Sequence, residues 1–295
     1  MNDTVAVTIV TRNGKALLEE CLSALSAQTW KNILVTVADN GSSDGSQEFV
    51  RRAYPQAELL EFGENAGFAR PNNRAVNTAI SKGADYCLLL NNDVTLMPDA
   101  IEKLVRCARE NPRAGAIAPV QYYADRPDTV LSAGGNVDLR RGLVSHRRTA
   151  PATCTETGFV SGAAFFAPAE ILKRTGLLHE PYFFYGEDAD LSVRIMRAGF
   201  KLLCCPEARC LHRAQGSSGN GAFRLYHMTR TRLMMEARLA SWPEKAYFLA
   251  FFLRNTIWGE YRALRRRGDN ALADALLDGI KDWLRGRISE KYINA

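Results

Sequence analysis

The stretch CLLLNNDVTL, residues 87–96, decides the fold class of this chain. Its apolar run from Cys87 to Leu90 stops abruptly at three polar residues, Asn91, Asn92 and Asp93. Asn and Asp are common turn residues, so one interpretation is a plain turn. The other is that a buried strand delivers three polar side chains to a site that holds a metal ion and a phosphate.

Four short apolar segments of this kind alternate with helical patterns in the first third of the chain. Near-continuous apolar strands separated by helices indicate a parallel sheet that is buried on both faces. We therefore expect an α/β fold with a mixed, mostly parallel, Rossmann-like sheet flanked by helices. The expected strands are residues 5–10, 33–38, 58–62 and 86–90, and the expected helices are residues 17–25, 47–53, 72–81 and 99–110.

Each of these four strands is followed by a polar loop. The loops are residues 11–14, 39–45, 63–69 and 91–93. One polar loop at a strand end is an ordinary turn, but in open α/β sheets the ligands bind at the carboxyl ends of the strands. Four such loops at one edge of one sheet therefore indicate a binding site.

The rest of the chain is less regular. Residues 159–167 read as a strand interrupted at Ser161-Gly162, and separate short strands are expected at residues 202–205 and before His212. Residues 216–221 are rich in Gly and Ser, which is typical of a linker or a mobile loop. Beyond it the pattern is helical to about residue 290, so we expect an α/β domain over 1–215 and a helical extension over 216–295.

Composition narrows the function classes. The chain has 295 residues, of which 46% are hydrophobic and 24% charged, as in ordinary globular proteins. Its net charge is +6, which suits nucleic acid, anionic lipid or a phosphorylated substrate. There is no phosphate loop of the ATPase type, no dinucleotide-binding glycine pattern and no nucleic-acid recognition module, so hydride transfer, ATP hydrolysis and nucleic-acid binding are not expected. Seven cysteines without metal-type spacing, and no signal-peptide pattern, predict reduced thiols and a cytoplasmic location.

Seven motifs in a fixed order carry a resemblance to a known family. They are VTRNG, DNGSSDGS, NAGFARPNN, LLLNNDV, FVSGAAFF, FFYGEDADLSVR and CLHR, and they extend from about residue 5 to residue 213. The sequence resembles family 2 glycosyltransferases of the GT-A fold, the inverting kind that uses a nucleotide sugar. Within this family NAGFA and YGEDADLS are most similar to bacterial rhamnosyltransferases, which implies dTDP-rhamnose as the donor.

The resemblance implies a divalent cation, Mn²⁺ or Mg²⁺, with Asp93 and His212 as ligands. Such a cation neutralises the charge that develops on the departing diphosphate. Asn91 stands where the family motif has a first Asp, so metal binding without nucleotide is expected to be weak. Asn91 would instead contact the ribose or a metal-bound water, and Asn92 completes the set of nucleotide-binding residues at this strand end.

Five further residues are implied to bind the nucleotide. Asp39 would accept the N3–H of a uracil or thymine ring, with Thr11 and Asn13 lining the same pocket. Asn65 and Asn73 match family positions near the ribose and the pyrophosphate. Uracil and thymine both offer this N–H, so these residues do not distinguish UDP from dTDP.

The resemblance places the general base of an inverting transfer at Asp188. One carboxylate is needed to take the proton of the acceptor hydroxyl, and Glu187 would orient that acceptor. The alternative is that Asp188 only caps the helix that begins there. The acceptor implied by the family is a hydroxyl of a bacterial surface glycan or of a lipid-linked oligosaccharide.

Residues 242–268 combine aromatic residues with an arginine run, Arg262 and 265–267. This segment reads as a core-packing helix with a basic solvated end, as a helix on the anionic inner surface of the cytoplasmic membrane, or as a homodimer interface. Two other functions remain open: a UDP-sugar transferase of the same family, and a non-catalytic protein that binds nucleotide or glycan on the same fold. A nucleotidyltransferase is disfavoured because residues 11–14 are too short and too poor in Gly for its phosphate loop.

Overall fold

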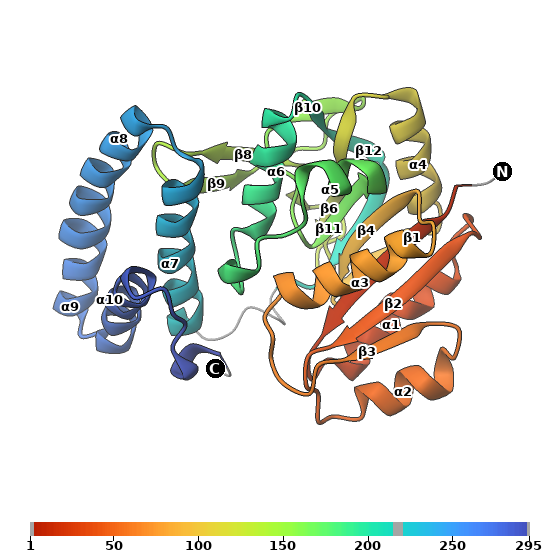
Figure 1. Ribbon diagram of the computed structural model, residues 1–295, viewed down its shortest axis with the longest axis horizontal. Helices are drawn as coiled ribbons and strands as arrows, with labels where there is room; N and C mark the ends of the chain where they lie inside the picture. Colours follow the sequence, from red (N-terminus) through yellow and green to blue (C-terminus); the bar gives the residue numbers. More distant parts are fainter. Residues whose placement is uncertain (1–2, 215–220, 294–295) are drawn as a thin grey trace. The chain divides into compact units, whose positions relative to one another are not determined.

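The computed structural model describes residues 3–214 and 221–293, which fall into two compact units (Figure 1). Of the described residues, the first unit comprises 3–136, 145–183 and 187–214, and the second comprises 137–144, 184–186 and 221–293. The expected domain boundary after residue 215, and residues 216–220 of the linker expected over 216–221, lie outside the described residues, whereas Gly221 begins helix α7 Gly221–Leu239.

The first unit is built on one mixed sheet. Its strand order is β10-β12-β6-β11-β4-β1-β2-β3, with β5 paired to β12 and β7 paired to β6. This arrangement confirms the predicted α/β sheet. The strands are β1 Val5–Thr11, β2 Ile33–Asp39, β3 Glu58–Glu61, β4 Tyr86–Asn91, β5 Val94–Leu96, β6 Ala114–Tyr123, β7 Val130–Ser132, β10 Thr155–Thr157, β11 Ala164–Pro168 and β12 Lys201–His212, while β8 Gly135–Asp138 and β9 Leu143–His146 form a separate two-stranded sheet.

The register of the first four strands gathers their polar ends. β1 pairs in parallel with both β2 and β4, so that Thr11 lies opposite Asp39 and Val10 lies opposite Asn91. β2 in turn pairs in parallel with β3, and Asp39 lies opposite Glu61. The polar loops that follow these strands therefore meet at one edge of the sheet, as the sequence predicts.

Two strands differ from their expected extent. The strand expected over 159–167 is β11, which begins only at Ala164 and pairs antiparallel with β4. The two short strands expected near 202–205 and His212 are one strand, β12. The chain passes Pro206, which cannot donate a hydrogen bond to a neighbouring strand, with a shift of register against β6 between Cys205 and Arg209.

Helices cover both faces of the sheet because alternate residues of each strand point to opposite sides. Val7 of β1 packs in one apolar cluster with helices α1 and α4, which contribute Leu22 and Leu104. Ala6 packs in a second cluster, to which α3 and α6 contribute Val76 and Ile195. The helices are α1 Lys15–Ser26, α2 Ser46–Ala53, α3 Ala69–Ser81, α4 Ala100–Glu110, α5 Ala169–Thr175, the 3-10 turn η1 Glu180–Tyr182, and α6 Glu187–Arg197.

The second unit is helical, as expected for the C-terminal region. Tyr226 and Tyr292 stack in its interior with ring centroids 4.0 Å apart, and Phe248 and Phe252 pack against Leu233. None of the helices within 3–214 and 221–293 is long and apolar enough to pass through a membrane. The helices are α7 Gly221–Leu239, α8 Trp242–Phe252, the π-helical stretch η2 Leu253–Tyr261, α9 Arg262–Arg267, α10 Asn270–Leu284 and the 3-10 turn η3 Glu290–Tyr292.

Candidate active site

Asp39, the last residue of β2, presents one unused acceptor at the carboxyl edge of the sheet. Its Oδ1 accepts hydrogen bonds from the Ser42 N–H at 3.0 Å and from Gln47 Nε2 at 2.6 Å. Its Oδ2 is buried and has no hydrogen-bond partner within the described parts of the chain. An unsatisfied buried acceptor costs roughly 1–3 kcal/mol, so Oδ2 is suited to a donor that a ligand brings, such as a ring N–H.

Asn13 holds the loop that follows Asp39. Its backbone N–H donates to Ser42 Oγ at 2.9 Å, and its Oδ1 accepts the Ser43 N–H at 2.8 Å. Asn13 adopts a φ of 50°, a left-handed conformation that Asn tolerates better than most residues. Ser42 therefore contacts both residues, because its N–H also donates to Asp39 Oδ1. This shared contact is compatible with the prediction that Asn13 and Asp39 line one pocket.

Thr11 and Asn92 also lie together. Asn92 Nδ2 donates to Thr11 Oγ1 at 2.9 Å, joining the ends of β1 and β4. A Cβ on Gly14 would lie 2.4 Å from Asn92 Nδ2, so the amide needs a glycine at that position. Asn91 stands at the end of β4 with its side chain partly exposed, and its backbone N–H donates to the Ala163 carbonyl at 2.9 Å.

Asn40 is a buried residue of this edge that the sequence analysis did not select. Its Nδ2 donates to Asn65 Oδ1 at 3.0 Å and to the Gly67 carbonyl at 2.8 Å, while its Oδ1 accepts the Ala66 N–H at 2.8 Å. Asn40 therefore fixes the loop that carries Asn65 against the end of β2. Its position directly after Asp39 was the signal that could have identified it.

Asn73, on α3, has a structural contact besides its expected nucleotide role. Its Nδ2 donates to the Leu178 carbonyl at 2.8 Å and its Oδ1 accepts the Leu178 N–H at 3.0 Å. Close by, the Phe68 N–H donates to the Phe183 carbonyl at 2.6 Å. These bonds join the segment 66–73 to the segment 178–183, and the nucleotide role of Asn73 stays a prediction.

The pairing of β5 with β12 brings Asp93 and His212 together. His212 lies opposite Val94 in this pairing, and His212 Nε2 is 3.3 Å from Asp93 Oδ1. The other ring nitrogen, Nδ1, is 3.1 Å from Gln121 Oε1. Because an amide oxygen can only accept, Nδ1 donates to Gln121, and Nε2 is the ring nitrogen that faces the carboxylate.

This donor set fits a divalent cation. A carboxylate and an imidazole nitrogen suit Mn²⁺, and Mg²⁺ is usually held by few protein carboxylates together with phosphate oxygens and water. Within 3–214 and 221–293 no cluster of three or more His, Cys, Asp or Glu side chains could hold a metal ion. Asp93 and His212 would therefore need oxygen atoms from a bound diphosphate and from water, in agreement with the Asn that stands at position 91.

Asp188 lies in the first turn of α6 and faces the loop before β11. Its Oδ2 accepts the Gly162 N–H at 2.8 Å, and its Oδ1 accepts the Ala189 N–H at 2.8 Å. Burial raises the pKa of Asp188, and these two N–H donors partly oppose that rise. The bond to Ala189 is a local contact at the start of the helix, whereas the bond to Gly162 fixes the direction of the carboxylate. Gly162 was quoted within a motif but was not selected as a site residue.

Glu187 is buried, and its pKa is raised well above the ordinary range by burial and by the neighbouring Asp188. Its Oε2 has no hydrogen-bond partner among the residues that the structure describes. Two adjacent carboxyl groups in one buried place do not readily ionise together. The first proton therefore leaves Asp188, and Glu187 keeps its own proton at a pH where Asp188 is a carboxylate.

Asp190 secures the helix that carries this pair. The Tyr182 hydroxyl donates to Asp190 Oδ2 at 3.1 Å, and Arg194 Nε donates to Asp190 Oδ1 at 2.5 Å. Arg194 also donates to the backbone carbonyls of Thr175 at 2.6 Å and Leu177 at 2.7 Å. A fully buried carboxylate with two such partners fixes α6, and hence Asp188, to the segment 175–182.

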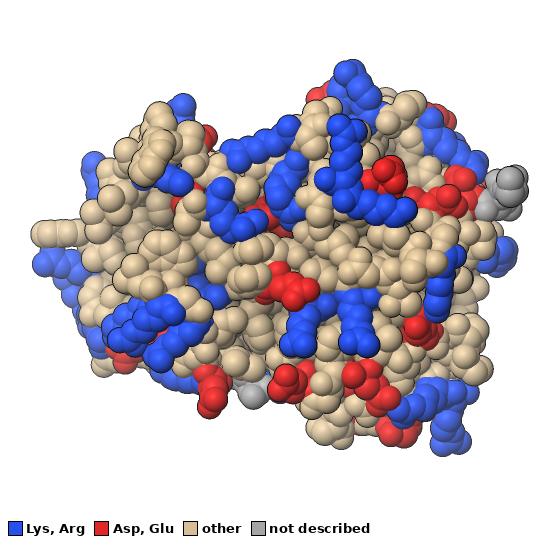
Figure 2. Space-filling view, in the orientation of Figure 1, with Lys and Arg blue, Asp and Glu red and all other residues tan. Residues whose placement is uncertain are grey.

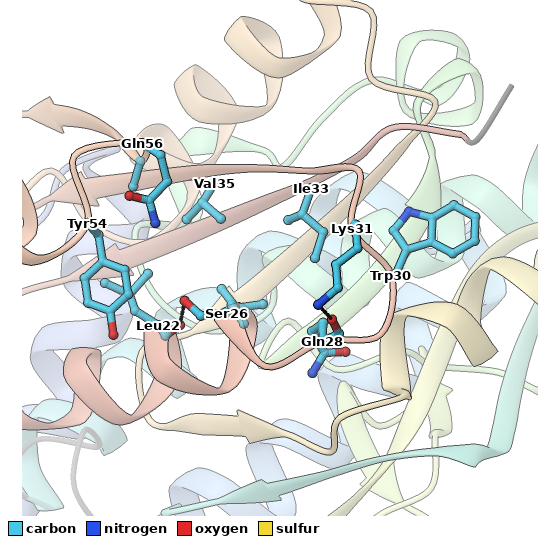
Figure 3. A pocket seen from close by; sticks show the side chains of 11 residues that line it. Leu22, Ser26, Gln28, Trp30, Lys31, Ile33, Val35, Tyr54 and Gln56 are labelled. Carbon is cyan, nitrogen blue, oxygen red and sulfur yellow. Dashed lines mark hydrogen bonds between the residues drawn. The ribbon is translucent and has the colours of Figure 1, made fainter.

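A cavity of about 190 Å³ lies elsewhere, between α1 and the first half of β2 (Figure 3). Trp30 and Tyr54 stand at its two sides, with Ile33 and Val35 of β2 between them. Its lining, drawn entirely from described residues, contains no carboxylate. Because Ile33 begins β2 and Asp39 ends it, this cavity is remote from the carboxyl edge and is not the site of the reaction.

The chain belongs to glycosyl transferase family 2, since the model of that family matches residues 6–176, more than half of the sequence. It is a glycosyltransferase. The N-acetylglucosaminyl-diphospho-decaprenol L-rhamnosyltransferase of Mycobacterium tuberculosis is 29% identical over 267 residues, which are 82% of this chain and 87% of that protein. The dTDP-rhamnosyl transferase RfbF of Shigella flexneri is 23% identical over 216 residues, 72% of this chain and 70% of that protein.

Solved structures confirm the fold. The mannosyltransferase PcManGT from Pyrobaculum calidifontis, in complex with GDP-Man and Mn²⁺, aligns with a TM-score of 0.57 over 96% of this chain and 88% of its own, at 20% identity. GalNAc-T7 with UDP, GalNAc and Mn²⁺ aligns with a TM-score of 0.58 over 86% of this chain and 56% of its own, at 16% identity. At these identities the likeness concerns the fold alone, which is the expected GT-A fold.

Proposed function

We propose that this glycosyltransferase moves rhamnose from dTDP-rhamnose, with inversion, to a hydroxyl of a bacterial surface glycan or a lipid-linked oligosaccharide. The observation that carries the proposal is the arrangement at one sheet edge: Asp39 ends β2, Asp93 follows β4 and contacts His212, and Asp188 accepts the N–H of Gly162, next to Ala163, whose carbonyl binds the end of β4. The names of the relatives from Mycobacterium tuberculosis and Shigella flexneri support rhamnose as the sugar.

The donor end of the site would recognise a pyrimidine nucleotide. Asp39 Oδ2 would accept the N3–H of the base, which thymine and uracil share. Asp93 and His212 would hold the divalent cation, which when bound supplies positive charge to the departing diphosphate. Asn91, being neutral, leaves that cation dependent on the diphosphate for further negative ligands.

The acceptor end would work through Asp188. Its carboxylate would take the proton of the acceptor hydroxyl as that oxygen attacks the anomeric carbon from the side opposite the diphosphate, which inverts the configuration. The raised pKa makes Asp188 a stronger base than an ordinary aspartate. Glu187, which keeps its proton while Asp188 is ionised, would donate a hydrogen bond to the acceptor.

Calorimetric titration of dTDP, UDP and GDP, each with and without Mn²⁺ or Mg²⁺, tests this proposal. Metal-dependent binding of dTDP that is lost in Asp93→Ala is the expected result, and it would justify transfer assays with dTDP-sugars. A preference for UDP would keep the enzyme and replace its sugar. If no nucleotide binds under any metal condition, the donor site is refuted and the non-catalytic alternative replaces it.

We also propose that α8 and η2 rest on an anionic membrane surface, beside a lipid-linked acceptor. Trp242, Leu249 and Leu253 are spaced as one face of an α-helix, and Trp258 follows at the spacing of a π-helix. These four side chains are 84%, 57%, 48% and 64% exposed in that order. Cations lie beside them: Arg262, the first residue of α9, is 4.3 Å from the Trp258 ring centre, and further arginines follow in α9. Exposed aromatics with arginines suit the boundary of an anionic bilayer.

Sedimentation with phosphatidylglycerol vesicles, compared with neutral phosphatidylcholine vesicles, tests the membrane proposal. We expect binding to the anionic vesicles only, and its loss in the double variant Trp242→Ala, Trp258→Ala. Light scattering on the same samples identifies the alternative, because a dimer that the double variant dissociates would assign this face to a second copy instead.

On the face drawn in Figure 2, basic side chains gather in separate groups with acidic ones between them, which does not resemble the continuous basic stripe of a nucleic-acid-binding surface.

A further inference from the structure

Three cysteines from different parts of the sequence meet in the first unit. Cys107 lies on α4, Cys154 directly precedes β10, and Cys205 lies on β12. The sulfur atoms of Cys107 and Cys154 are 3.1 Å apart. A disulfide bond is about 2.05 Å long, so an approach of about 1 Å would join them. All seven cysteines of the chain are free thiols in the structure.

The three thiols differ in access and in acidity. Cys154 is exposed, whereas Cys107 and Cys205 are each only 4% exposed. The Cys107 thiol donates to Cys205, which lowers the pKa of Cys205 to about 7, with further help from the Ala208 backbone and from nearby Arg106. The same bond, together with burial, raises the pKa of Cys107. Although the residue is exposed, partial desolvation of its sulfur, with the nearby Cys205 and Glu110, raises the pKa of Cys154.

We propose that Cys107 and Cys154 are a site of reversible disulfide formation, with a low-molecular-weight disulfide such as glutathione disulfide as the oxidant. Exposed Cys154 loses its proton to water and attacks the small disulfide, which forms a mixed disulfide and releases one thiol. Cys107 then loses its proton to solvent and attacks the Cys154 sulfur, which releases the second thiol. Two protein thiols are oxidised and one small disulfide is reduced to two thiols.

Other uses of the cluster fit the structure less well. A thiophilic metal would need three ligands in a suitable arrangement, and no His, Cys, Asp or Glu group of that kind occurs in the described parts of the chain. The remaining cysteines, Cys21, Cys87, Cys204 and Cys210, are all buried. Cys204 precedes Cys205 on the same strand and so points to the other face of the sheet, which makes it an internal reference for access to reagents.

The test is thiol mapping on the folded enzyme. The protein is incubated with glutathione disulfide near neutral pH, quenched with acid, alkylated and digested, and its cysteine peptides are identified by mass spectrometry. We expect a Cys107–Cys154 cross-linked peptide that dithiothreitol reverses, while Cys204 is alkylated only after denaturation. The readout does not depend on glycosyl transfer, so it is independent of the proposed donor and acceptor.

Variants separate the steps. Cys154→Ser, at an exposed position, should abolish the cross-link, and Cys107→Ser should leave glutathione on Cys154. Circular dichroism confirms that each variant is folded. A wild-type protein that carries only the mixed disulfide on Cys154, or that cross-links Cys154 to Cys205, would overturn the proposal.

Discussion

Replacement of Asp188 by Asn separates the proposed general base from the helix cap at the same position. Asn keeps the size of the side chain and one acceptor oxygen, so it can still accept the N–H of either Gly162 or Ala189, but it cannot take a proton. General bases contribute about 10²–10⁴-fold to a rate. We therefore expect kcat to fall by about 10²–10⁴-fold while the KM for the donor changes little.

The structure also sets the expected effect on stability. One of the two N–H donors that Asp188 accepts at 2.8 Å loses its partner, which costs about 1–3 kcal/mol. In return, Asn carries no charge, so the burial that raises the pKa of Asp188 no longer opposes folding. The two effects oppose each other, and we expect the free energy of unfolding to change by less than about 2 kcal/mol.

Nucleoside diphosphate release in the presence of acceptor is the assay, with urea denaturation alongside. Activity needs an ionised Asp188, so kcat should fall as the pH drops through its raised pKa, at a higher pH than for an ordinary aspartate. Glu187→Gln is the matched control: it copies the protonated Glu187 and should leave this acidic limb in place. An Asp188→Asn enzyme that is folded and keeps more than about a tenth of kcat would refute the assignment.

Three further predictions concern the metal pair, a tight backbone contact and the second unit. Gln121→Leu removes the acceptor that orients the metal-site imidazole, so metal affinity in the presence of nucleoside diphosphate should fall by about 10–100-fold; an unchanged affinity in a metal titration would contradict this role. Gly67→Ala would place a Cβ 2.6 Å from the Phe183 carbonyl oxygen at a φ of 78°, so we expect a loss of about 1–3 kcal/mol in urea denaturation. Gly63→Ala is its control, because it has a similar φ of 72° but nothing within 4 Å, and an equal loss in both variants would exclude the contact as the cause. Burial raises the pKa of Glu236 from 4.5 to about 8, so the folded state holds this proton more tightly than the unfolded state. The resulting contribution to stability is complete below pH 4.5 and is lost as the pH rises through about 8. Glu236→Gln should therefore stabilise the protein by about 1–3 kcal/mol at about pH 9 and not at about pH 5; equal effects at both values, measured by denaturation, would refute this account.

The sequence predicts the parallel half of the sheet well because local rules apply there. The apolar runs that form β1, β2 and β4 are buried on both faces. The first polar residues after the apolar runs of β1 and β2, Thr11 and Asp39, mark the ends of these two strands. Parallel pairing then brings those loops together without any information beyond the strand order.

The residues that the sequence analysis did not select depend on pairings between distant segments. Gln121 faces His212 only because β6 and β12 are neighbours, and an isolated Gln in a β-like stretch carries no signal of that contact. Gly162 contributes a backbone N–H, which any residue type possesses, so its role with Asp188 is invisible in composition. The two short strands expected near 202–205 and His212 are one strand because β12 passes Pro206 with a shift of register against β6, which the local pattern does not reveal.

The bonds between the segments 66–73 and 178–183 have a consequence for protein engineering. The Phe68 N–H holds the Phe183 carbonyl, and both ends of the Asn73 amide hold the Leu178 backbone. Residues matched to the donor are thus tied to the chain that leads into the proposed base. The segment around 178–188 therefore cannot be exchanged alone to change acceptor specificity. A segment grafted from a relative would also need α3 and the loop 63–69 of that relative.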